Sequence, residues 1–260
     1  MLRTCLLLMV FCSSVGGAAF AQAEMAGIDL AAPKMTEANV TRAEVEATIA
    51  AGRPVTLAGR WLNGLDLSGL DLSGADLRAA GLNGTDLSGA VLRGAVLDQA
   101  WLLGADLTGA DLAGASLFQS QFGGARLAGA DLSGSRAAAN FTGADLTGAD
   151  FTGADLSADM KNQSMGLMRG VLRQAKAAGA IFADAKLMRS DLEYADLTGA
   201  DFTGADLSMA TLGGANLSGA EVGGAVFVDT DMASARLTGL LHADPAALGR
   251  AKNLDRAFRD

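Results

Sequence analysis

The chain has 260 residues, of which half are hydrophobic but only 5% are aromatic, and its formal net charge is -9. Because glycine and alanine are so abundant, a thick core of bulky side chains is excluded and a thin, elongated core is favoured. An acidic chain is repelled by phosphates, so we expect no nucleic acid partner.

Residues 1–23 have the pattern of a signal peptide. Arg3 supplies a positive charge, residues 4–20 carry none, and residues 21–23 (AQA) are typical of a cleavage site. The apolar run is slightly short for a membrane span, so cleavage is favoured over an uncleaved anchor and no stable membrane insertion is expected. We therefore predict a periplasmic or secreted protein whose mature chain begins near Glu24.

Both cysteines lie inside the segment that we expect to be removed. Without Cys5 and Cys12 the mature chain has no thiol, which excludes disulfides, thiolate metal sites and a cysteine nucleophile. A lipid attached at Cys12 is the weaker alternative, because the residue before it is the bulky Phe11.

Residues 24–54 are predicted to form an N-terminal segment with a short capping helix. Thr41 and Glu44 have the spacing of a capping box, and Gly52 is suited to end the helix. Two apolar residues of this helix would face the end of the next element: Val45 and Ile49.

Residues 55–239 repeat with a period of five. From Leu57 to Leu132 every fifth residue is apolar, the residue two positions earlier is usually Ala, and the residue two positions later is usually Gly. In an extended segment Ala and Leu would point inward together, while the Asp between them would point outward. Gly tolerates the left-handed backbone of a tight corner, so the pattern predicts a chain that coils.

Two stretches carry a resemblance to a known family: GADLTGADLAGASL at 104–117 and YADLTGADFTGADLSMATLGGANLSGA at 194–220. They resemble the pentapeptide-repeat family, with A-(D/N)-L-x-x in tandem, over roughly residues 55–239. The resemblance implies an all-β solenoid, a right-handed quadrilateral β-helix with twenty residues per coil. It also implies two properties that are known for some members of the family. Some members mimic a DNA duplex and act on type II topoisomerases, and some pair through the C-terminal end.

The period slips twice. The step between apolar centres that ends at Phe141 is one residue shorter than two repeat units. The step from Leu156 to Leu167 is one residue longer than two repeat units. If the slips cancel, Leu167 lies on the same side as Leu67. Residues 159–164 would then form a widened side of the coil.

Methionine and basic residues surround the second slip. If residues twenty apart stack, Met168 lies beside Met188, and Arg169 beside Arg189. On an acidic rod such a patch is typical of a protein-binding surface, since Met is adaptable and Arg is enriched at interfaces. The candidate partner-binding residues are Met160, Lys161, Met165, Met168, Arg169, Met188, Arg189 and Met209. Two alternatives stay open for these methionines. One is that Met simply replaces Ser at outward positions at little energetic cost, and the other is that the Met thioethers form a Cu(I) site.

A secondary candidate patch lies near the start of the repeats. Trp61 and Trp101 occupy the Asp position of their units, with Gly81 between them. They would leave a slot of roughly 10 Å, two coil rises, for an apolar side chain or a sugar ring. Leu103 completes this patch. The alternative is that both Trp side chains fold against the rod or beneath the N-terminal helix.

Residues 240–260 are predicted to form a C-terminal capping helix. Asp244 and Pro245 are suited to the N-cap and first helical position, and the helix would run to about Phe258. Its apolar face would cover the coil end or form a homodimer contact: Leu248, Ala251 and Phe258.

Catalytic residues are nearly absent from the sequence. The single histidine, His242, precedes the C-terminal helix, where a solvated or capping role is expected. Columns of outward Asp, such as Asp66 and Asp86, would suit Ca²⁺, but their recurrence in coil after coil favours bonding to backbone and hydroxyl groups. We therefore expect no enzyme, no cofactor and no metal.

The sequence thus predicts an exported, non-catalytic scaffold that docks a protein partner through its Met and Arg residues. Two alternatives stay open. One is a DNA-mimic modulator of a type II topoisomerase, if the protein is cytoplasmic, and the other is a periplasmic metal-binding protein.

Overall fold

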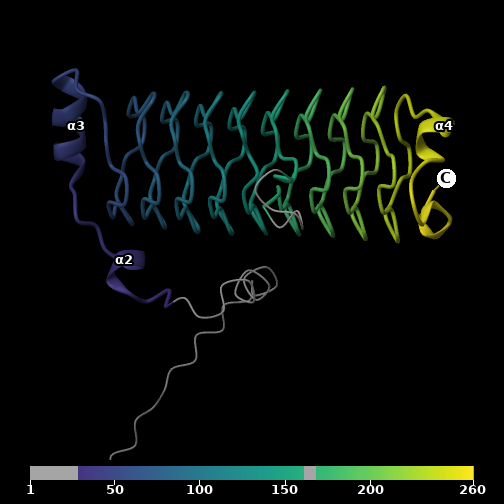
Figure 1. The fold of residues 1–260 in the computed structure, drawn as a ribbon, viewed down its shortest axis with the longest axis horizontal. Coiled ribbons are helices and arrows are strands. Elements are labelled where there is room, and N and C mark those ends of the chain that lie inside the picture. The colour runs from purple at the N-terminus through teal and green to yellow at the C-terminus, as the bar shows by residue number, and fades with distance from the viewer. Residues whose placement is uncertain (1–28, 161–167, 260) are drawn as a thin grey trace, which may run out of the picture.

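The computed structural model describes residues 29–160 and 168–259, which form a rod of stacked coils (Figure 1). Helix α3 covers one end of the rod and α4 lies at the other. The predicted signal peptide and two predicted site residues, Lys161 and Met165, lie outside the described residues. Within the described ranges, no helix has the length and apolarity needed to cross a membrane.

The coils are held together by parallel pairing between sides twenty residues apart. Asp66 pairs with Asp86, and Asp86 with Asp106, in one continuous column. Across the first of these steps Leu67 N donates to Asp86 O at 2.7 Å. Each side contributes one bridging residue, so the described part of the chain contains bridges rather than longer strands. These bridges form four columns, one on each face of the rod. We label each face by the first outward residue of its column: Thr56 for face A, Trp61 for face B, Asp66 for face C and Asp71 for face D.

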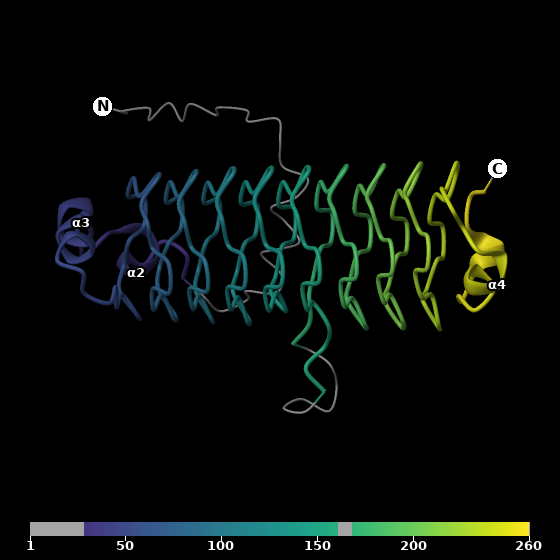
Figure 2. The same cartoon turned by 90° about the horizontal axis from the view of Figure 1, so that it is seen from above.

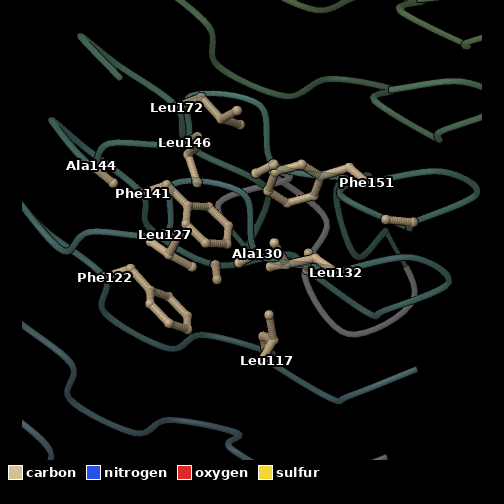
Figure 3. Packing of buried hydrophobic residues seen from close by; sticks show 14 of the residues in the cluster. Leu117, Phe122, Leu127, Ala130, Leu132, Phe141, Ala144, Leu146, Phe151 and Leu172 are labelled. Carbon is tan, nitrogen blue, oxygen red and sulfur yellow. The ribbon is translucent and has the colours of Figure 1, made fainter. Parts of the chain in front are cut away.

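The core is a column of apolar side chains inside the coils. The Leu centres and the Ala residues are almost fully buried, as the alternation predicts. In the middle of the rod Phe replaces Leu, and the rings of Phe122 and Phe141 stack at 4.9 Å between centroids (Figure 3). Phe151 and Phe182 stack at 5.1 Å on face D. Each stack adds about 1 kcal/mol beyond its buried area, which stabilises the irregular middle coils.

The outward Asp residues bond to the corner that follows them. Asp66 Oδ1 accepts hydrogen bonds from Ser68 N at 3.0 Å and from Ser68 Oγ at 2.6 Å. Asp71 and Ser73 repeat the arrangement. The hydrogen bond from the serine hydroxyl, followed by that from the serine N–H, lowers the pKa of both carboxyl groups. This local bonding to backbone and hydroxyl groups agrees with the role predicted from the recurrence of Asp.

The N-terminal end of the rod is covered by α3 (Arg42–Ala50). The predicted capping box is present: Thr41 N donates to Glu44 Oε2 at 2.7 Å, and Glu44 N donates to Thr41 Oγ1 at 3.3 Å. Val45 is buried, and Ile49 packs against the core. A preceding short helix, α2 (Pro33–Thr36), lies against face B.

The C-terminal segment departs from the prediction of one helix reaching about Phe258. Only α4 (Pro245–Leu248) and a 3-10 turn η1 (Leu254–Arg256) are helical. Between and after them Lys252 pairs with Asp231, and Phe258 pairs with Arg236. The unpaired backbone of the last coil is satisfied by these bonds, so the chain continues the solenoid instead of a helix. Phe258 is 60% exposed and does not face the coil end, whereas Leu248 and Ala251 do pack against the core.

The second slip of the repeat is larger than predicted. The first slip is confirmed, because Gln121 pairs with Asn140, nineteen residues on. Asn140, however, pairs with Val171, thirty-one residues on, so eleven residues are inserted and residues 159–164 are not a widened side. The residues flanking this insertion leave the rod (Figure 2), and Asp159 N donates to Met168 O at 2.8 Å where the chain returns. The position expected for Leu167 lies outside the described residues.

Candidate binding surface at one corner of the rod

The corner between faces A and B, called corner AB, has unusual backbone residues. At the corner between faces C and D, every described corner residue with a positive φ is Gly. At corner AB, Gly59 is followed by larger residues with φ between 53° and 63°: Ala79, Gln99, Gln119, Arg189, Met209 and Asp229. The left-handed conformation costs a residue with a Cβ about 1–2 kcal/mol. The non-Gly residues at this corner therefore occupy it despite an unfavourable backbone conformational energy.

Three of the predicted methionines are exposed at this corner and beside the insertion. Met160 is 44% exposed, Met188 is 38% exposed and Met209 is 40% exposed. Arg189 precedes Met209 on the corner, with Arg189 N donating to Ser208 O at 3.0 Å. Met188, Arg189 and Met209 form an apolar and basic surface on the C-terminal side of the insertion, and Met160 follows Asp159 at the base of the insertion.

The predicted stacking of Met168 on Met188 and of Arg169 on Arg189 is wrong. The coil neighbour of Met188 is Ala158, whose N–H donates to Met188 O at 3.0 Å. Met168 instead pairs with Asp159 at the base of the insertion, because the eleven inserted residues displace it from the coil.

Arg169 ties the base of the insertion to face B. Its Nη2 donates to Asp191 Oδ2 at 3.2 Å, and Arg173 Nε donates to the same oxygen at 3.0 Å. Asp191 is buried, so its charge requires these two guanidinium groups. Arg173 also pairs with Glu193 on the next coil. This network fixes the backbone on the C-terminal side of the insertion.

A groove of about 650 Å³ lies at corner AB on the N-terminal side of the insertion. We call it the amide groove, and its lining residues are Ala79, Gln99, Trp101, Gln119, Gln121, Ala138, Ala139, Asn140, Met168, Arg169 and Val171. It brings Trp101 together with Met168 and Arg169, which the sequence placed in two separate patches.

The slot predicted between Trp61 and Trp101 is filled by the N-terminal segment. A Cβ placed on Gly81 would lie 3.0 Å from Lys34 O, and Asn83 Nδ2 donates to Met35 O at 3.1 Å. Leu103 is half-buried and lies outside the lining of the amide groove. Both Trp residues lie on face B, but only Trp101 lines the amide groove, so the two Trp do not share a site.

Amide side chains of the groove were missed in the sequence. Gln99 Nε2 donates to Gln119 Oε1 at 3.2 Å, and Asn140 Nδ2 donates to Gln121 Oε1 at 3.1 Å. Gln121 Nε2 in turn donates to Gln119 O at 3.1 Å. A signal for them exists, because Gln stands where the repeat expects Gly at 99 and 119, and where it expects Asp at 121.

The titratable groups offer little chemistry. Across residues 29–160 and 168–259, no group of three or more His, Cys, Asp or Glu side chains could hold a metal ion. His242 Nδ1 lies 2.6 Å from Glu221 Oε2, and this hydrogen bond is the main cause of the lowered pKa of Glu221. The histidine is therefore engaged at the C-terminal end of the rod.

The family follows from comparison with known proteins. The model of pentapeptide repeats matches the chain in eight copies, in segments that together span residues 62–158 and 171–239. The chain therefore belongs to the pentapeptide-repeat family, and the fold class predicted from the sequence, a right-handed quadrilateral β-helix, is confirmed. The matched family is a structural repeat and not a family of enzymes.

Several solved structures align with this chain. HetL, a pentapeptide repeat protein involved in regulating heterocyst differentiation in the cyanobacterium Nostoc sp. strain PCC 7120, is 29% identical; 85% of this chain aligns with 95% of HetL at a TM-score of 0.41. Full-length QnrB1, a plasmid-mediated fluoroquinolone resistance protein, is 17% identical, with 80% and 92% of the two chains aligned and a TM-score of 0.43. A pentapeptide repeat protein of the Arabidopsis thaliana thylakoid lumen is 24% identical, with 65% and 68% aligned and a TM-score of 0.21. Among curated proteins none matches the sequence.

Proposed function

We propose that this chain is an exported, non-catalytic scaffold that binds a protein partner through corner AB beside the insertion. The observation that carries the proposal is the set of exposed Met side chains with Arg189, two members of which, Arg189 and Met209, keep a left-handed backbone. Contiguous exposed apolar side chains mark interaction sites, and Met adapts its shape to a partner. The Met/Arg patch consists of Met160, Met168, Arg169, Met188, Arg189 and Met209, with Lys161 and Met165 as further predicted members.

The charge around the patch favours an acidic partner surface. Lys186 stands on face A between Asp155 and Asp206, where the repeat usually places Asp, and its side chain is exposed. Together with Arg189 it reverses the sign of an otherwise acidic rod at this point. Complementary charge speeds association and selects the partner, while the Met side chains supply the apolar contact.

Site-specific photo-crosslinking tests the proposal. A photoreactive amino acid at position 188 or 209 is expected to capture one protein in the native compartment. The same amino acid at position 88 or 198, on the corner between faces C and D, is the matched control and is expected to capture none. Equal capture from both corners, or no capture from either, would contradict docking through the Met/Arg patch.

Export is supported by the sequence pattern of residues 1–23 and is tested separately. Cell fractionation with the intact mass of the purified protein is expected to give a periplasmic or secreted chain that begins near Glu24. A cytoplasmic chain that keeps residues 1–23 would contradict export. It would favour the second candidate, a DNA-mimic modulator of a type II topoisomerase, for which an inhibited supercoiling reaction is the readout.

The second candidate is favoured by the acidic columns of the rod. Face C carries Asp66, Asp86 and Asp106 in one line, and the whole chain has a net charge of -9. Lys176 interrupts the same face between Asp145 and Asp196, so the acidic surface is not continuous. We rank this candidate below the scaffold because of that interruption and because of the signal-peptide pattern. A periplasmic metal-binding role is tested by whether Cu(I) or Ca²⁺ raises the melting temperature.

A further inference from the structure

The geometry of the amide groove points to a second function: we propose that it binds a neutral oligosaccharide, in contact with Trp101. The groove shares Met168 and Arg169 with the Met/Arg patch but not the exposed methionines at 188 and 209, and the inference does not depend on the protein partner. The groove has a volume of about 650 Å³, which is in the range of small-molecule sites.

Charge is the first argument. The chain is acidic, yet within residues 29–160 and 168–259 no carboxylate lines the groove. On the coils that form it, face B carries Trp101, Gln121 and Asn140 where faces C and D carry residues such as Asp106 and Asp131. Arg169 is the one charged residue among the described residues that line the groove, and it is neutralised by Asp191. A groove without net charge favours a neutral ligand over a phosphate or a carboxylate.

Hydrogen bonding is the second argument. Each carboxamide offers both donors and acceptors, which suits the hydroxyl groups of a sugar. We call the hydrogen-bonded carboxamides of the groove the amide ladder. In this ladder Gln99 Nε2 donates to Gln119 Oε1, which leaves Gln99 Oε1 and Gln119 Nε2 without hydrogen bonds to the described residues. These groups repeat from coil to coil along the rod axis. They can therefore meet successive residues of an extended saccharide chain.

The aromatic residue is the third argument. Trp101 is half-buried in the lining, and its indole N–H has no hydrogen-bond acceptor among the described residues. The flat apolar face of an indole packs against the C–H face of a pyranose ring, and its N–H can donate to a hydroxyl. The groove thus combines an aromatic surface with an adjacent amide ladder, which fits a sugar better than an apolar peptide.

Backbone cost is the fourth argument. Gln99 and Gln119 both have φ of 62°, a conformation that Gly adopts freely. Gly would serve the fold at these corners, as it does at Gly84 and Gly104 on the same coils. The retained glutamines indicate a role for their side chains beyond folding.

Tryptophan fluorescence tests the proposal directly. The chain has two Trp residues, so Trp61→Phe leaves Trp101 as the single reporter in the full-length rod. Titration of this variant with cellotetraose and chitotetraose is expected to give a saturable change in emission with at least one of them. Trigalacturonate, which is anionic, is expected to bind at least about tenfold more weakly.

Two further variants separate ligand contact from folding. Gln99→Gly combined with Gln119→Gly keeps the corner conformation and is expected to weaken saccharide binding about tenfold without lowering the melting temperature. Met188→Ser combined with Met209→Ser is expected to leave it unchanged, which separates this proposal from partner docking. The proposal is overturned if neither saccharide binds at millimolar concentration, if the glutamine variant binds equally well, or if the tetrapeptide Ala-Leu-Ala-Leu binds more tightly.

Discussion

At the scale of single residues, a corner position that is usually Gly separates side chains kept for the fold from those kept for another purpose. Gly89 has φ of 61°, and a Cβ placed on it would meet no atom within 4 Å, so Gly89→Ala is expected to cost about 1 kcal/mol of unfolding free energy through backbone strain alone. Met209→Gly relieves the same strain, and the gain is offset by the added freedom of the unfolded chain. We expect the unfolding free energy of Met209→Gly to stay within about 0.5 kcal/mol of the wild type, as measured by urea denaturation. A larger loss would show that Met209 supports the rod itself.

The outward Asp residues make the rod sensitive to acid. Hydrogen bonds from Ser68 and Ser73 lower the pKa of Asp66 and Asp71 below the ordinary value of 3.8. A carboxyl group with a lowered folded pKa contributes stability above its unfolded pKa, and that stability is lost as pH falls through the folded pKa. The melting temperature is therefore expected to be flat above about pH 5 and to fall below about pH 4.

The double variant Asp66→Asn with Asp71→Asn checks the cause of this acid sensitivity. Asn216 already fills the same role, since its Oδ1 accepts from Ser218 N at 3.2 Å and from Ser218 Oγ at 2.7 Å. The variant is expected to fold and to lose less of its melting temperature between neutral and acid pH. An unchanged acid profile would assign the sensitivity to other groups.

At the scale of elements, α3 and the insertion can be removed or weakened independently of the coils. Thr41→Ala deletes one hydrogen bond of the capping box and is expected to cost about 1 kcal/mol, measured by urea denaturation. Thr36→Ala is the control, because Thr36 Oγ1 bonds only within the short α2 and is exposed. An equal loss in both variants would mean that the effect is not specific to the cap.

The insertion offers a sharper test, because removing its eleven residues leaves a coil of the usual length. Asn140 and Val171 are thirty-one residues apart, and deleting residues 159–169 would restore the twenty-residue spacing of the other coils. We expect the shortened chain to keep the circular dichroism spectrum of the rod and to melt at a lower temperature, because the deletion removes Arg169 from the buried Asp191. It is expected to lose crosslinking from positions 188 and 209. A shortened rod that still captures the partner would place the partner site outside the insertion and its flanks.

At the scale of the whole molecule, the C-terminal end carries exposed apolar side chains on which the predicted homodimer depends. Leu241 is 51% exposed and Phe258 is 60% exposed at that end, although the segment does not form the predicted long helix. A homodimer through this end stays a prediction, and it is measured by light scattering after size exclusion. Leu241→Ser with Phe258→Ser is expected to give a monomer, whereas Tyr194→Ser, which changes a side chain 61% exposed on another corner, is expected to have no effect. A monomeric wild-type protein would contradict the predicted homodimer.

The sequence by itself determined the coil, its inward Ala and Leu, its outward Asp and the capping box of α3, because each depends on the five-residue period or on neighbours within one turn. Only the tertiary structure decided where Met168 and Trp101 lie. Their positions depend on how many residues leave the coil between Ala158 and Gly170 and on where α2 lies against face B. The period predicted a slip of one residue after Leu156, whereas the pairing between coils joins Asp155 to Lys186, thirty-one residues on. The C-terminal helix was overestimated for the same reason, since the open backbone of the last coil binds Lys252 and Phe258 more favourably than a longer helix would allow.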